Sequence, residues 1–262
     1  MAVNHRMERI TEIVQKEKNV TVNYLSKKLG VTEKTIRLDL EKLEKTNVLI
    51  RVHGGAICND KSISVYPNRE YRGKFSLEKK EIAKTALSLI EPNDIILLDD
   101  GTTTLELAKL LGDFPVTVLT NDITIFNELI SKDLINLYIV GGALRRDGNS
   151  LIISGDDAVQ FIKKFRVNKL FLGVSTIDKD NGLMIFHYGD KTIKRAFMSI
   201  ANEIICLAVS AKFNQTAFTN FADIDEIDKI ITDSKLDYTV LEDYKNANIQ
   251  VMVSDEYKEK KL

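Results

Sequence analysis

The chain has few of the residues on which disulfide-bonded, metal-binding or membrane-spanning proteins depend. Only two of its 262 residues are cysteines, and Cys58 and Cys206 lie far apart without a metal-ligand spacing. This usage favours a reducing, cytoplasmic compartment, and Cys206, inside an apolar run, is expected to be a buried core thiol. No stretch of about eighteen apolar residues is present, so we expect no membrane span. The charged N-terminal segment differs from a signal peptide, and we expect no metal and no cofactor.

Net charge is nearly absent as well. The formal net charge is −1 at pH 7, which by itself argues against nucleic-acid binding. The charges are unevenly distributed, however. Residues 1–60 hold 11 Lys and Arg against 8 Asp and Glu, whereas the remaining 202 residues hold 26 against 30. The small basic excess therefore lies at the N-terminal end, and we expect a homo-oligomer, because one such module alone would bind a polyanion weakly.

Proline is scarce too. One of the three prolines, Pro67, lies in a stretch with few large aliphatic residues and no clear periodicity. The chain is longer than one typical domain, and its hydrophobic fraction of 44% suffices for sizeable cores. We therefore predict a first domain at residues 1–57, a linker at 58–74 and a second domain at 75–262.

The most informative segment runs from Val20 to Gly55. Thr21 and Thr32 each stand where a side-chain oxygen would cap a short helix, and Gly30 follows the first helix where positive φ is needed. Apolar residues recur at steps of three and four, which places them on one face of each helix: Val22, Leu25 and Leu29, then Ile36, Leu40 and Leu43. Two short helices, a tight turn and a glycine-terminated hairpin together indicate a winged helix-turn-helix.

The second helix and the hairpin hold the candidate DNA contacts. The N-terminal part of such a helix enters the major groove, arginine is the commonest bidentate reader of guanine, and hairpin residues two apart share one face. We predict contacts to double-stranded operator DNA from Thr32, Lys34, Thr35, Arg37, Arg51 and His53, with Thr35 and Arg37 foremost. The alternative is an ordinary three-helix bundle over residues 6–46 with a solvated Lys/Glu face. That alternative does not account for the order of caps, turn glycine, arginine and hairpin.

From about Phe75, short apolar strands alternate with helices. The strands are rich in Ile, Val and Leu, as expected where both faces are covered; we expect them at Ile95–Asp99, Val116–Thr120, Leu137–Gly141, Lys169–Val174, Ile204–Ser210, Lys229–Thr232 and Ile249–Val253. Helices are expected at Leu77–Ile90, Thr103–Leu111, Ile123–Ile130, Asp157–Phe165 and Thr192–Ala201. The alternation predicts a doubly wound, Rossmann-like α/β domain with a parallel sheet.

Ligands of open α/β sheets bind beyond the carboxyl ends of the strands. The first strand is followed by Asp99–Thr104, in which Gly101 precedes three threonines at the start of a helix. Free backbone N–H groups, the helix dipole and hydroxyl donors together favour a phosphate-type ligand there. The alternative is a plainly capped helix, for which one threonine would suffice.

Other strand ends contribute polar or small residues to the same expected crevice. Asn121 follows the second strand, Gly141 and Gly142 follow the third, and the loop after the fourth ends at Asp178. Each is weak evidence alone, because such residues also form ordinary turns. Lys194 and its neighbour Arg195 would add positive charge, although Arg195 fits a solvated helix face equally well.

Several motifs resemble those of the DeoR family of bacterial transcriptional regulators. LGVTEKTIRLDLEKLE and RVHGGA are similar to its N-terminal signature, and DDGTTTLELAKLL, VLTND, IVGGALR, KLFLGVSTID and KRAF follow the order of its sensor domain. The resemblance covers about Met7 to Asp233. It implies a winged helix-turn-helix joined to a sensor domain akin to ribose-5-phosphate isomerase. It also implies a cytoplasmic regulator, most often a repressor of a sugar or carbohydrate catabolism operon, whose effector is a phosphorylated sugar or related metabolite.

The resemblance further implies an effector pocket formed by Asp99, Gly101, Thr102, Thr103, Thr104, Asn121, Gly141, Gly142 and Lys194. An alternative function is a sugar-phosphate isomerase or deaminase, but an isomerase needs clustered acids to move protons, and the loop after the fourth strand has only Asp178. Because fold kinship alone does not carry activity, we expect no enzyme. A second alternative is a regulator whose sensor domain serves only assembly into a dimer or tetramer.

The chain departs from the family pattern at five positions. Leu38 stands where the recognition helix usually has a second arginine, which predicts weaker DNA affinity or a different operator. His187 and Gly189 replace two acids, Asp100 replaces an alanine and Val209 replaces an aspartate. Because four of these positions lie near the expected pocket, the resemblance does not transfer a particular sugar phosphate.

Overall fold

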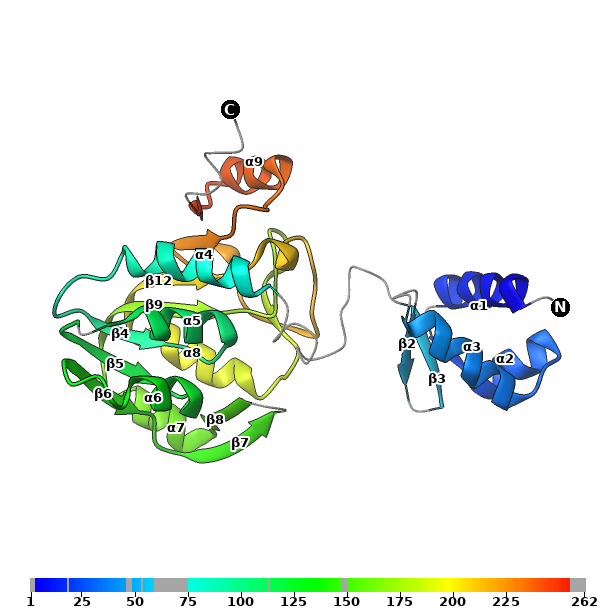
Figure 1. Cartoon of the computed structure of the whole chain (residues 1–262), viewed down its shortest axis with the longest axis horizontal. Coiled ribbons are helices and arrows are strands. Elements are labelled where there is room, and N and C mark those ends of the chain that lie inside the picture. The colour runs from blue at the N-terminus through cyan, green and yellow to red at the C-terminus, as the bar shows by residue number, and fades with distance from the viewer. Residues whose placement is uncertain are drawn as a thin grey trace. The chain divides into compact units, whose positions relative to one another are not determined.

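The computed structural model describes residues 3–17, 19–45, 49–52, 54–58, 75–112, 114–147 and 150–254. The chain divides into two compact units, residues 1–64 and 65–262 (Figure 1). The predicted linker lies almost wholly outside the described residues, so the predicted domain limits stay a prediction. No helix among the described residues is both long and apolar enough to cross a bilayer.

The described part of the first unit has three helices and a small antiparallel sheet in the order β1-β3-β2. Its elements are α1 Val3–Glu17, β1 Asn19–Thr21, α2 Val22–Leu29, α3 Glu33–Lys45, β2 Leu49–Val52 and β3 Gly55–Cys58. As predicted, the Thr21 side chain accepts a hydrogen bond from the N–H of Tyr24, and Gly30 ends α2 with φ of 66°. The fold is a winged helix-turn-helix, with β1 as a strand that was not predicted.

The core of the first unit fixes α3 against the other helices. Ile10 of α1, Leu25 of α2 and Ile36 of α3 are fully buried in one cluster. A buried ion pair also joins α1 to α3, because Arg6 donates to both carboxylate oxygens of Asp39, at 2.5 and 3.1 Å. The opposite side of α3 is left exposed to solvent.

The second unit is built on a seven-stranded sheet in the order β15-β14-β12-β9-β4-β5-β6, and every neighbouring pair is parallel. All seven predicted strands are present: β4 Ile95–Leu98, β5 Val116–Thr120, β6 Ile135–Ile139, β9 Val167–Gly173, β12 Ala201–Leu207, β14 Lys229–Thr232 and β15 Val251–Val253. The chain adds β5 and β6 on one side of β4, and then places β9 on the other. The order of the strands therefore reverses between β4 and β9.

Helices cover both faces of this sheet (Figure 1). One face packs Ile96 and Leu98 of β4 against α4 Ser76–Leu87, α5 Thr102–Leu110 and α6 Ile123–Leu129. The other packs Leu97 against α7 Asp156–Ile162 and α8 Asp190–Ile200. This alternation along one strand confirms the doubly wound α/β prediction, and Cys206 lies in the core as predicted.

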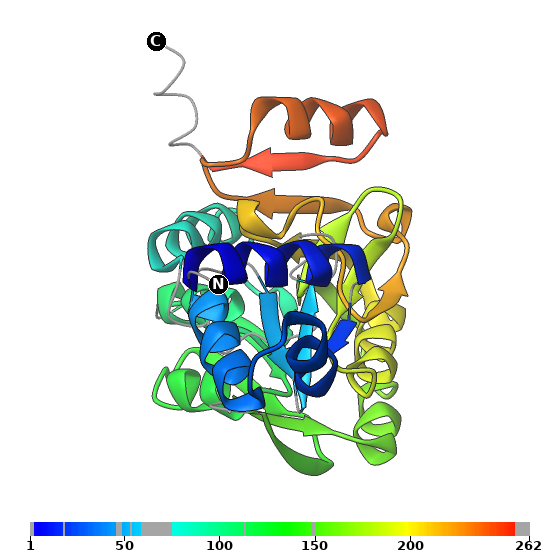
Figure 2. The ribbon, with the colours of Figure 1, turned by 90° about the vertical axis from the view of Figure 1, so that its right-hand side faces the viewer.

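Several elements were not predicted. They are a hairpin of β7 Ala143–Asp147 and β8 Ser150–Ser154, a small antiparallel sheet of β10 Thr176–Asp178, β11 Gly182–Ile185 and β13 Thr219–Ala222, two 3-10 turns (η1 Ser210–Lys212 and η2 Ile224–Glu226), and helix α9 Tyr238–Asn246. Figure 2 shows α9 lying along β15 at one edge of the large sheet. η1 brings Lys212 to the pocket described below, and the hairpin brings Arg145 to Asp190, which lines that pocket.

Candidate functional site

The N-terminal half of α3 presents most of the predicted DNA contacts on its exposed side. Lys34 and Arg37 are exposed, and Thr32 caps the helix by accepting a hydrogen bond from the N–H of Thr35 at 3.3 Å. The Thr35 hydroxyl lies 2.9 Å from that of Thr32. Arg37 donates to Glu33 at 2.8 Å, one turn earlier on the same helix. Two cations and two hydroxyls thus lie close to the end of the helix that would enter a groove.

The hairpin after α3 depends on its glycines. Gly54 has φ of 82°, and a Cβ on Gly55 would lie 2.1 Å from the carbonyl oxygen of Val20, so only glycine lets these strands approach. Arg51 is exposed on β2, and its guanidinium lies 3.8 Å from Glu44. His53 lies outside the described residues. The contacts of both wing residues with DNA stay a prediction.

A pocket of about 90 Å³ lies in the second unit where the strand order reverses between β4 and β9. The end of β9 and the residues that follow β4 and β9 line it, with others from β11, β12, α8 and the turns beside them: Asp100, Gly101, Thr102, Thr103, Thr104, Gly173, Val174, Ser175, Ile185, Phe186, His187, Asp190, Lys194, Leu207 and Lys212. The predicted loop therefore forms one wall of the pocket described by the structure.

That loop has the features of an anion cradle. Gly101 adopts φ of 151°, which disfavours any side chain, and α5 begins at the next residue. The first-turn N–H groups of a helix have no intrahelical partner, and they carry the positive end of the helix dipole. Thr104 is fully buried and donates to the carbonyl oxygen of Gly101 at 2.9 Å. Thr102, which is partly exposed, is the hydroxyl best placed to meet a ligand.

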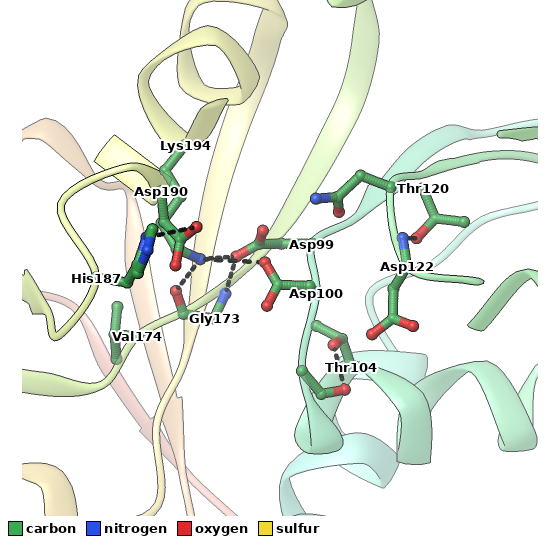
Figure 3. Close-up of polar contacts among 12 residues, drawn as sticks. Asp99, Asp100, Thr104, Thr120, Asp122, Gly173, Val174, His187, Asp190 and Lys194 are labelled. Atoms are coloured by element: carbon green, nitrogen blue, oxygen red, sulfur yellow. Dashed lines mark hydrogen bonds and ion pairs between the residues drawn. The ribbon is translucent and has the colours of Figure 1, made fainter. Parts of the chain in front are cut away.

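Lys194 of α8 reaches into the floor of the pocket (Figure 3). Its ammonium forms a buried ion pair with Asp99, donates to the carbonyl oxygen of Gly173 at 3.0 Å and lies 3.9 Å from Asp100. Burial lowers the pKa of Lys194, but the carboxylates of Asp99 and Asp100 outweigh burial and raise it overall. The ammonium therefore stays charged, and Asp99, which is fully buried, contacts Lys194 without itself lining the pocket.

Asp190 connects the pocket with the β7–β8 hairpin. Arg145 of β7 forms an ion pair with Asp190, and the ring of His187 lies 3.7 Å from the same carboxylate. Burial is the largest cause of a raised pKa at Asp190, and the nearby Asp100 carboxylate raises it further. Sequence reasoning noted this region only as a departure from the family pattern.

Lys212 is a further pocket cation, and it was not predicted. It lies in η1 just after β12, and its ammonium donates to the carbonyl oxygen of Val174. Burial, with smaller contributions from the neighbouring cations Lys79 and Lys194, lowers the pKa of Lys212 to about 8. The rule that ligands meet residues just after strand ends would have identified it, had it been applied to this strand.

Besides Asp99, which is buried beside Lys194, three residues predicted for the pocket do not line it. Asn121 is fully buried, and its side-chain amide donates to the carbonyl oxygen of Ile153 in β8. Gly142 allows close packing, since a Cβ on it would lie 2.9 Å from the Cβ of Ala158 in α7, whereas a Cβ on Gly141 would make only an ordinary contact with Phe161. These residues follow β5 and β6, which lie away from the reversal between β4 and β9.

Both units match known domains. Residues 6–62 match the DeoR-like helix-turn-helix domain, and residues 74–234 match the DeoR C terminal sensor domain. Among solved structures, a ribose 5-phosphate isomerase A from Methanocaldococcus jannaschii covers 52% of this chain and 53% of its own, with 17% identity and a TM-score of 0.38.

Proteins named as repressors match nearly the whole chain. One assigned to the aga operon of Escherichia coli O157:H7 is 34% identical over 97% of this chain and 94% of its own length. GlcR of Bacillus subtilis (strain 168) is 33% identical over 89% of each, and the glycerol-3-phosphate regulon repressor of Escherichia coli (strain K12) is 30% identical over 96% and 99%. The chain belongs to the DeoR family of transcriptional regulators.

Proposed function

We propose that this chain represses a carbohydrate catabolism operon and that a phosphorylated sugar, bound in the Gly101–Thr104 pocket, changes its affinity for operator DNA. The observation that carries the proposal is the pocket itself. A helix N-terminus opens onto it at the reversal of strand order, and two lysines, Lys194 and Lys212, line it. Such a site suits a phosphate monoester, because it supplies N–H donors, hydroxyls and ammonium groups together.

The relatives support the biological part of the proposal. Their names refer to an aga operon, a lactose phosphotransferase system and a glycerol-3-phosphate regulon. DNA binding is supported by the exposed side chains of Lys34 and Arg37 on α3 and by the cap at Thr32. We propose no cofactor and no metal for this function.

We also propose that the chain is not an enzyme. Asp178, the acid after β9, accepts hydrogen bonds from Asn181 and the N–H of Asp180 and does not line the pocket. Of the pocket acids, Asp190 is paired with Arg145, and Asp100 lies 3.9 Å from Lys194. Isomerase and deaminase assays on the full chain with sugar phosphates test this, and turnover that is lost in Asp100→Asn would overturn it.

Assembly is the third part of the proposal. The basic excess of residues 1–60 is small, so one helix-turn-helix unit has little electrostatic affinity for DNA. Two copies on adjacent half-sites would double the number of phosphate contacts. We propose a dimer or tetramer held through the second unit, which sedimentation of the free protein at micromolar concentration can detect.

A thermal-shift screen of phosphorylated sugars tests the whole proposal, because a ligand that binds only the folded state raises the melting temperature. A hit should lose its effect in Thr102→Ala and keep it in Thr124→Ala, a matched change at the exposed start of α6. The sensor would serve assembly alone if no sugar phosphate stabilised the parent protein.

A further inference from the structure

Leu38 is an exposed apolar side chain on the face of α3 that is proposed to meet DNA. The other large apolar residues described on this helix are buried: Ile36 is 0%, Leu40 is 1% and Leu43 is 7% exposed, whereas Leu38 is 51% exposed. It lies one turn after Lys34 and next to Arg37, both of which are exposed. Leu38 is therefore flanked by cations on the outer side of the helix.

The chemistry of a leucine limits what it can contact on a duplex. It has no donor, so it cannot bond a phosphate or the polar edge of a base. The apolar group that the major groove offers is the 5-methyl of thymine. Leu38 is the sixth residue of α3, within the N-terminal half of the helix, which is the half that reaches base edges in helix-turn-helix proteins.

We infer that Leu38 is a specificity-determining residue that packs on the 5-methyl group of a thymine in each operator half-site. The inference rests on the proposed DNA binding and adds which base the helix reads. Lys34 and Arg37 then hold phosphates or polar base edges on either side, and the leucine selects a thymine between them. The contribution is apolar, so it depends weakly on salt, unlike that of its neighbours.

The test begins with selection of bound sites from a random duplex library by the full-length parent. Each thymine of the selected site is then replaced by deoxyuridine, which removes only the methyl group. The parent should lose about fourfold in affinity per half-site at one position, the fold-change expected for one buried methyl group. Leu38→Ala should bind the thymine and deoxyuridine duplexes equally at that position.

Leu77→Ala is the matched control, since Leu77 is also an exposed leucine, 70% accessible, but lies on α4 of the other unit. It should keep the parent's dependence on the methyl group. The inference is overturned if the parent binds equally well with deoxyuridine at every thymine position. It is also overturned if replacing the thymine by deoxyuridine costs Leu38→Ala as much affinity as it costs the parent. Failure of the parent to enrich any duplex would instead overturn the proposed DNA binding.

Discussion

Lys194 of α8 donates to Asp99 at the end of β4, although 95 residues separate them along the chain. Both side chains are buried, and the pair lies under the loop that opens the pocket. The ion pair therefore joins α8, which supplies the Lys194 ammonium, to β4, which leads into the Gly101–Thr104 loop.

Breaking this pair should destabilise the second unit. Lys194→Met leaves the Asp99 carboxylate buried without its cation, which should lower the free energy of unfolding by about 3–5 kcal/mol. Scanning calorimetry, which can separate the transitions of two units, measures the change. The double variant Asp99→Asn/Lys194→Met should recover part of the loss, and a double variant no more stable than the single one would contradict this explanation.

Ligand affinity should fall as pH rises through the pKa of Lys212. With that pKa lowered to about 8, the side chain is mostly charged at pH 7 and mostly neutral at pH 9. A sugar phosphate is already a dianion over this range, so it should bind up to about tenfold more weakly per pH unit above 8. Calorimetric titration at pH 7, 8 and 9 measures this.

Lys212→Arg is the control for that pH dependence, because arginine stays charged throughout and should flatten the profile. Titration of Lys212 does not unfold the protein over this range, so unfolding does not account for the weaker binding. The folded pKa lies below the ordinary value of 10.5, so between the two values the unfolded chain binds more protons and this group favours folding as pH rises. An unchanged profile in Lys212→Arg would mean that another group titrates.

Arg37 and Glu33 should affect DNA binding in opposite directions. Arg37→Ala should weaken binding by roughly 5- to 150-fold, the range for losing one specific arginine contact. Glu33→Gln releases Arg37 from its ion pair at 2.8 Å and removes a negative charge from the same face, so it should tighten binding. Fluorescence anisotropy with a labelled duplex measures both.

The control for both variants is their melting temperature, which shows whether either change affects folding. The Arg37–Glu33 pair is largely exposed, so neither change should alter the melting temperature by more than a degree or two. If Arg37→Ala bound DNA like the parent, α3 would not be the recognition helix.

The sequence predicted the sheet well and the pocket in part. All seven strands of the sheet were found, because runs such as Ile95–Leu98 are apolar on both faces and leave a strong signal. The hairpin 143–154 was missed, since its strands mix Arg145 and Arg146 with apolar residues and have no sharp period. The helix caps at Thr21 and Thr32 and the turn at Gly30 were predicted, because capping depends only on residues that are close together in the sequence.

The pocket depends on strand order, which no local pattern reveals. Asn121 and Gly142 follow strands as Gly101 does, but they lie beside β5 and β6, away from the reversal between β4 and β9. Lys212 and Arg145 approach the site from η1 and from the hairpin, each far along the chain from Asp99. Only the assembled sheet brings these groups together.

The central claim is that one chain couples operator binding to a phosphorylated sugar at the Gly101–Thr104 loop. The most direct measurement is the anisotropy of a labelled operator duplex bound to the full-length protein, titrated with the sugar phosphate that stabilises it most. Saturating ligand should change the DNA affinity of the parent at least tenfold. Thr102→Ala, which loses one hydrogen bond to a charged ligand, should need at least roughly 10-fold more ligand to reach the same change. An identical response in parent and Thr102→Ala, or a bound ligand that leaves DNA affinity unchanged, would contradict the account.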